Sequence, residues 1–160
     1  MNKLRSIMAY IAKAYPHKNE LSKARLTKLI YLSDWFSSLL DGKQMTDIRW
    51  VFNHYGPYVD DVSNIAAFDS EFSIKPEKTV YGSDKYVISY CGSGVDNVLS
   101  EREKAIIDAV IDKTKSMYFN DFINYVYSTY PVSSSERYAE MNLEALARKY
   151  KAERAAGAQG

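Results

Sequence analysis

The chain has 160 residues, of which 46% are hydrophobic and 26% are charged, close to the average of globular proteins. This length can build one hydrophobic core, and the sequence contains neither the ~18 consecutive apolar residues of a membrane span nor a signal peptide. The single cysteine, Cys91, excludes a disulfide framework and a cysteine zinc site. We therefore expect one cytoplasmic domain over residues 1–150, without metal or cofactor, and a frayed tail over residues 151–160.

Charge is balanced over the whole chain but uneven along it. The net charge of +1 at pH 7 does not favour a dedicated nucleic-acid-binding protein. Residues 1–30 carry seven Lys or Arg side chains and one acidic residue, whereas residues 31–72 carry two basic and seven acidic residues. If the two segments lie on different faces, this polarity can orient a charged protein partner during association. Ordinary solvated helix faces would produce the same pattern.

Tyrosine is the most unusual feature of the composition, with 14 residues in the chain. A tyrosine ring offers a large contact area, few rotatable bonds and a polar hydroxyl, so tyrosines are enriched at protein interfaces. Tyrosines also line the rim of a hydrophobic core with their hydroxyls in water. The composition by itself leaves both interpretations open.

Two helices are predicted at the start of the chain. Apolar spacing indicates an amphipathic helix over residues 3–15, which ends because Pro16 pushes the preceding residue out of the helical conformation. A second helix runs from a cap at Asn19 or Ser22 to the turn before Gly42. Since this helix is apolar nearly all the way round, we expect it to be buried at the centre of the fold.

The next segment predicts a strand, a turn and a helix. Residues 48–55 are rich in aromatic and β-branched side chains and indicate a short strand. After Gly56, we expect Pro57 to open a helix at its first position, where a missing N–H is tolerated. Asp60 and Asp61 would then lie in or near the first turn, where the helix dipole favours acidic side chains.

The fold class that follows is α+β, a mostly helical domain with a buried central helix and a small antiparallel hairpin or sheet. Alternation around a Gly-Ser-Asp turn predicts the hairpin over residues 72–91, with residues 48–54 as a candidate further strand. Ser100 and Glu103 have the spacing of a capping box and predict a helix start. Another helix follows and is ended by Pro131, and a last helix precedes the tail.

The usual catalytic motifs are absent from this sequence. There is no Walker loop, nucleophile elbow, Gly-rich dinucleotide turn or His-Glu-x-x-His. His54 is a candidate general base beside Asp34 or Asp60, or a residue that only holds the neighbouring turn. Cys91 lacks a flanking base to activate it and is interpreted as a small buried hydrophobe. The Asp60-Asp61 pair lacks the further oxygen ligands that calcium needs, so we expect a binding protein, not an enzyme.

Two motifs follow each other along the chain. Lys-Leu-Ile-Tyr-Leu-Ser-Asp occupies residues 28–34 on the predicted central helix, and Tyr-Gly-Pro occupies residues 55–57. Together they resemble the Panacea domain of SocA-like antitoxins, a family with phage-associated relatives. Tyr58 departs from the family pattern, which has a small aliphatic residue there, and Val59 takes that role one position later.

The resemblance implies an antitoxin that neutralises a cognate protein toxin by direct binding, the toxin acting on translation or on tRNA. It also implies a structural role for the shared motif residues, with Asp34 accepting hydrogen bonds from backbone near Gly56. These residues are Lys28, Leu29, Tyr31, Asp34, Gly56 and Pro57. The alternatives are a phage- or plasmid-borne regulatory binder, a proteolytic adaptor of a host protein and, less favoured, a nucleic-acid-binding module.

Partner binding is expected on an aromatic, partly acidic patch around the Gly-Pro turn. The candidates are Trp50, Tyr55, Tyr58, Asp60 and Asp61, because Tyr and Trp dominate interface energetics and acids suit a basic, nucleic-acid-binding toxin. Tyr58 and Asp61 are three residues apart on the predicted helix and share a face, so they would form one patch with Tyr55. The alternative is that Tyr58 packs inward. No membrane partner is expected, and formation of a homo-oligomer is left open.

Overall fold

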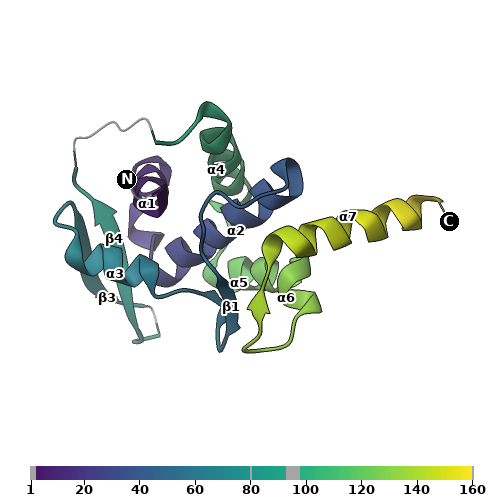
Figure 1. The fold of residues 1–160 in the computed structure, drawn as a ribbon. Coiled ribbons are helices and arrows are strands. Elements are labelled where there is room, and N and C mark those ends of the chain that lie inside the picture. Colours follow the sequence, from purple (N-terminus) through teal and green to yellow (C-terminus); the bar gives the residue numbers. More distant parts are fainter. Residues whose placement is uncertain (1–2, 80, 93–97, 160) are drawn as a thin grey trace. The chain divides into compact units, whose positions relative to one another are not determined.

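The computed structural model describes residues 3–79, 81–92 and 98–159 of the chain (Figure 1). The helices are α1 (Lys3–Ala14), the 3-10 helix η1 (Lys18–Glu20), α2 (Lys23–Asp41), α3 (Asp61–Phe68), α4 (Glu101–Thr114), α5 (Phe119–Ser128), α6 (Tyr130–Ser134) and α7 (Leu143–Gln159). The strands are β1 (Trp50–Asn53), β2 (Gly56–Tyr58), β3 (Phe72–Lys78), β4 (Asp84–Tyr90) and β5 (Glu140–Met141). The chain therefore has the expected fold class, mostly helical α+β with small antiparallel sheets.

The chain divides into two compact units, which we describe separately. Unit 1 comprises residues 1–30 and 60–116, and unit 2 comprises residues 31–59 and 117–160. The boundary falls within α2, so the first eight residues of this helix belong to unit 1 and the remainder to unit 2.

Unit 1 is built around the β3–β4 hairpin, which confirms the hairpin predicted over residues 72–91. The two strands pair antiparallel in a continuous register from Phe72–Tyr90 to Lys78–Asp84. Helix α1 packs against β4, α3 and α4, and α3 packs against β3 (Figure 1). The segment before α2 runs along β4, where the Ile88 N–H donates to the Leu21 carbonyl at 3.0 Å. This segment occupies part of an edge that a two-stranded sheet would otherwise expose.

The helix ends predicted from local sequence are confirmed where the side chains supply caps. Of the two proposed caps of α2, Ser22 is the one used, because its hydroxyl accepts a hydrogen bond from the Arg25 N–H at 3.1 Å. Gly42 follows α2 with a φ of 77°, a conformation that glycine adopts without strain. Ser100 and Glu103 form both hydrogen bonds of a capping box at the start of α4.

The central helix is buried as expected. Every residue from 26 to 35 has a relative exposure of 4% or less, including the charged side chains of Lys28 and Asp34. A helix covered on all sides must satisfy its own polar groups, so the partners of these two side chains determine what the helix can do.

Unit 2 contains a separate three-stranded antiparallel sheet in the order β2-β1-β5. The strand predicted over residues 48–54 is therefore present as β1, but it does not extend the β3–β4 hairpin. The predicted helix start at Pro57 is wrong, because Pro57 lies in β2 opposite Phe52 and α3 begins only at Asp61. Gly56 has a φ of 102°, which lets the chain reverse after β1, and an edge strand tolerates the missing N–H of proline.

Replacing Gly56 with alanine is expected to lower the free energy of unfolding by about 1–2 kcal/mol, because a Cβ is disfavoured at positive φ. Gly157 is the matched control, since it lies in α7, its φ is not positive, and an added Cβ would meet nothing within 4 Å. Gly157→Ala should leave the stability unchanged or slightly raised. Thermal melting of both variants measures the difference, and equal melting temperatures would contradict this account of the turn.

One segment in the last third of the chain also differs from expectation. Helix α5 ends at Ser128, three residues before Pro131, which instead lies in the first turn of α6, where its missing N–H is tolerated. The tail over residues 151–160 is helical as far as Gln159, where α7 ends. Residues 151–157 are exposed, and the predicted fraying of this tail stays a prediction. Its alanines and charged residues are good helix formers, and Leu143 anchors the start of α7 in the core.

No helix in the described residues is long and apolar enough to cross a membrane. The same residues contain no group of three or more His, Cys, Asp or Glu side chains arranged to hold a metal ion.

Candidate partner-binding surface

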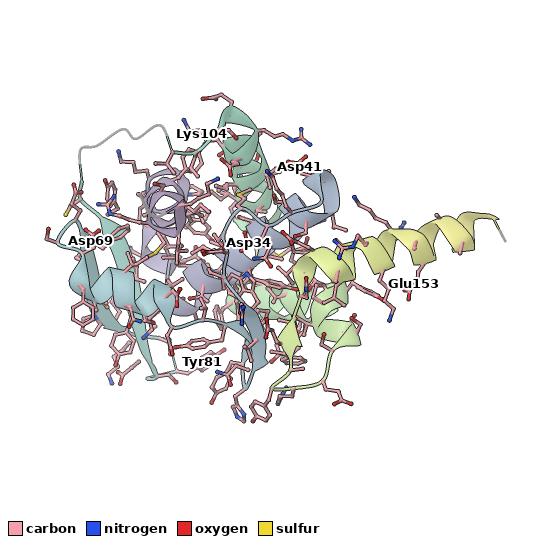
Figure 2. All side chains as sticks on the ribbon, viewed as in Figure 1. Asp34, Asp41, Asp69, Tyr81, Lys104 and Glu153 are labelled. Atoms are coloured by element: carbon pink, nitrogen blue, oxygen red, sulfur yellow. The ribbon has the colours of Figure 1, made fainter. Side chains whose placement is uncertain are left out.

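The buried carboxylate of Asp34 joins α2 to the segment that leads into β1, all within unit 2. Its Oδ1 accepts hydrogen bonds from the backbone N–H groups of Met45 and Thr46 at 2.9 and 3.0 Å. Its Oδ2 accepts from the Thr46 hydroxyl at 2.5 Å, from Trp50 Nε1 at 2.9 Å and from Gln44 Nε2 at 3.4 Å. Asp34, which Figure 2 labels, therefore holds the loop and orients the first residue of β1.

Burial raises the pKa of Asp34 to about 6, against the opposing effect of the hydrogen bonds from Thr46, Trp50 and Met45. The folded protein is therefore expected to bind a proton at Asp34 between about pH 4 and pH 6, where the unfolded chain does not. The contribution of this group to stability is largest below pH 4 and is lost as the pH rises through 6.

An NMR titration of the Asp34 carboxyl carbon should show a midpoint near pH 6. A midpoint below the ordinary value of about 4 would mean that the donors outweigh the cost of burying the charge.

Two expectations about this region are corrected by the structure. The Asp34 carboxylate does accept backbone hydrogen bonds, but they come from residues 45 and 46 and not from the turn at Gly56. Trp50 is not available to a partner, because its relative exposure is 0% and its indole N–H is donated to Asp34. The alternation of β1 turns Trp50 and Phe52 to the buried side.

The other residues of the two motifs are also buried, except for Tyr55, which is exposed. In unit 2, the Tyr31 hydroxyl lies 2.8 Å from Thr129 Oγ1, and its ring packs edge-on to Trp50 with 5.7 Å between ring centroids. Gly56 and Pro57 are buried in the turn and in β2. In unit 1, Leu29 is buried, and burial lowers the pKa of Lys28 to about 8. Their positions agree with the structural role that the resemblance implies.

An exposed group of side chains surrounds the β1–β2 turn of unit 2; we call His54, Tyr55 and Tyr138 the hairpin cluster. Tyr55 and Tyr138 have relative exposures of 76% and 64%. The His54 ring packs edge-on to Tyr55 with 4.7 Å between centroids, and its Nδ1 lies 3.4 Å from the Tyr138 hydroxyl. The cluster thus gathers two large exposed tyrosines from distant parts of the sequence.

The backbone under the hairpin cluster is held in an uncommon conformation. Tyr138 has a φ of 72°, rare for a residue with a bulky side chain. Its N–H donates to the Phe52 carbonyl at 2.5 Å, and the Phe52 N–H donates to the Ala139 carbonyl at 3.0 Å. The guanidinium of Arg137 lies over the Phe52 ring at 5.3 Å. These contacts hold Tyr138 beside β1.

The remaining predicted partner-binding residues are distributed over both units. Tyr58 is half-buried in unit 2, in β2 opposite Val51, so the predicted helix face shared by Tyr58 and Asp61 does not exist. Asp60 and Asp61 belong to unit 1 and are exposed at the start of α3, with Asp61 in its first turn as expected. Partner binding by Tyr55, Tyr58, Asp60 and Asp61 stays a prediction.

The surroundings of the two candidate reactive residues, His54 and Cys91, differ from those predicted. The described contacts of the His54 ring are with Tyr55 and Tyr138, and neither Asp34 nor Asp60 is among them. The His54 backbone N–H donates to Asn53 Oδ1 at 2.9 Å. Cys91 is exposed and not buried, and its thiol lies 3.2 Å from the Glu71 carbonyl. Tyr138 was not predicted at all, since it is 84 residues from His54 and only the high tyrosine content pointed toward an interface.

Comparison with protein families gives a match. The sequence profile of a family described as antitoxin SocA-like, Panacea domain, matches residues 26–131, about two thirds of the chain. The matched range includes the buried motif residues of α2, the β1–β2 turn and the hairpin of unit 1. Searches of curated proteins and of solved structures gave no match.

Proposed function

Since the chain belongs to the SocA-like antitoxin family with a Panacea domain, we propose that it neutralises a cognate protein toxin by binding it directly in the cytoplasm. The observation that carries this proposal is the family match, which spans both motifs. The toxin of such a pair acts on an essential process, for which translation or tRNA is the candidate, and a bound antitoxin blocks access to its active or substrate site.

The hairpin cluster supports binding by contact. Large aromatic side chains that remain exposed and pre-positioned are typical hot spots, because they bury a large area on binding and lose little conformational entropy. Tyr55 and Tyr138 meet both conditions: each is more than half exposed, and His54 and the pairing with Phe52 hold them in place. We propose that this cluster forms the centre of the toxin contact.

The proposed neutralisation needs no catalysis. We expect the purified protein alone to show no hydrolase, nucleotidyltransferase or nuclease activity, since the sequence carries none of the usual motifs. A measured turnover that disappears in a folded His54→Ala variant would contradict this part of the proposal.

Co-expression with the product of the neighbouring gene tests the function. The neighbouring gene product alone should arrest growth, and this chain should restore growth and co-purify with that product as a stable complex. Restored growth without a complex would contradict neutralisation by direct binding. Failure of neighbouring gene products to arrest growth would favour the alternative of a regulatory binder of a host protein.

A further inference from the structure

Four lysines of unit 1 lie together where the segment between α1 and α2 meets β4. The Lys18 ammonium donates to the carbonyls of Ala12 and Lys13 at 2.6 Å each. The Lys85 ammonium, on β4, donates to the Asn19 carbonyl at 3.1 Å, next to Lys18 in the chain. The Lys85 contact brings an ammonium group from β4 beside the segment that carries Lys18.

Tyrosine rings of β4 hold the other two ammonium groups. Lys23 Nζ lies 5.4 Å from the centroid of the Tyr86 ring, and Lys13 Nζ lies 5.4 Å from that of Tyr90. Tyr86 and Tyr90 are four residues apart on one strand and therefore share a face of the hairpin. The Lys85 side chain starts on the opposite face, and its ammonium reaches the Asn19 carbonyl in the segment that runs along the edge of β4. We call Lys13, Lys18, Lys23, Lys85 and Tyr86 the lysine surface.

The charge of the lysine surface is not neutralised by acids. Within the described part of the chain, none of its four lysines lies within ion-pair distance of a carboxylate. Acids that border these lysines have other neighbours. Glu20 lies 4.0 Å from His17. Glu77, the cross-strand neighbour of Lys85, pairs with Lys75 at 3.6 Å, and Asp84 pairs with Lys78 at 2.6 Å. Lys18 and Lys85 bind carbonyl oxygens, which leaves their positive charge in place.

An aromatic ring beside these charges indicates what they bind. Tyr86 is 44% exposed, although Lys23 lies over its ring. Exposed aromatic rings within a basic surface are typical of proteins that bind single-stranded nucleic acid, because lysines contact phosphates and rings stack on bases. An acidic protein segment would use the lysines but would gain nothing specific from the ring.

We propose that the lysine surface binds single-stranded RNA or DNA, with phosphates at the four lysines and a base on Tyr86. This inference goes beyond the proposed toxin neutralisation, which we place on the hairpin cluster of unit 2. It is tested with the chain alone, so its outcome does not depend on the toxin.

Titration of a fluorescently labelled oligouridylate with the full chain tests the proposal. Four phosphate contacts predict that log K falls with log salt with a slope of about −3, at roughly 0.7 per contact. The Lys13→Gln, Lys23→Gln double variant should bind more weakly and lose about 1.4 of that slope. Tyr86→Leu should weaken binding about tenfold and leave the slope unchanged, because it removes stacking and no charge.

The Lys149→Gln, Lys151→Gln double variant is the matched control, since both lysines are exposed on α7 of unit 2. It should bind the oligonucleotide as the wild type does, and circular dichroism should show all variants folded. The proposal would be overturned if the folded chain did not bind oligouridylate at low salt. It would also be overturned if the control variant lost as much affinity as the Lys13→Gln, Lys23→Gln variant. If the chain bound poly-L-glutamate as tightly as oligouridylate, and Tyr86→Leu did not weaken oligouridylate binding, the proposal would be overturned in favour of an acidic protein partner.

Discussion

Replacing Asp34 with alanine is expected to lower the free energy of unfolding by about 3 kcal/mol or more. The variant would leave the backbone N–H groups of Met45 and Thr46 and the indole N–H of Trp50 buried without an acceptor. Each buried donor without a partner costs about 1–3 kcal/mol. Urea denaturation followed by Trp fluorescence measures the loss.

Two further variants separate the role of the carboxylate from a general effect of charge. Asp47→Ala removes an exposed acid from the same segment and should leave the unfolding midpoint almost unchanged. Asp34→Asn should also lower the free energy of unfolding, because one carboxylate oxygen is replaced by an amide N–H₂ group. This group would face N–H or O–H donors that now bind Asp34. An unchanged midpoint in Asp34→Ala together with lost toxin binding would move Asp34 from a structural role to the interface.

Replacing Tyr55 or Tyr138 with alanine is expected to weaken toxin binding by about 2 kcal/mol each, roughly 30-fold in Kd. Both side chains are mostly exposed, so their loss should change the melting temperature little. Since the two rings are joined through His54, the effects of the two substitutions should not add in the double variant. Calorimetric titration against the co-purified toxin gives the Kd values.

Tyr81 supplies the matched control for this surface. It is 90% exposed at the turn of the β3–β4 hairpin (Figure 2), in unit 1 and thus in the other compact unit. Tyr81→Ala should keep the wild-type affinity for the toxin. Wild-type affinity in a folded Tyr55→Ala, Tyr138→Ala variant would remove the hairpin cluster from the interface without touching the family assignment.

The sequence alone was sufficient to predict those parts of the fold that depend on interactions between neighbouring residues. The cap of α2 at Ser22 and the capping box of α4 join residues three apart, and the hairpin of unit 1 follows from alternation around one turn. The two family motifs are each contiguous, so they too could be identified from consecutive residues. Burial of the central helix followed from its apolar circumference.

Features that depend on pairing between distant segments could be seen only in the tertiary structure. Pro57 became part of β2 because its neighbours pair with β1, which outweighed the helix-start preference of the Pro-x-x-Asp segment. Asp34 found its donors 10 to 16 residues away, and Trp50 was buried as one of them. His54 met Tyr138 across 84 residues because β5 pairs with β1. Spacing along the chain reports only neighbours within a few residues, whereas these contacts depend on strand register and on which side chains fill the same space.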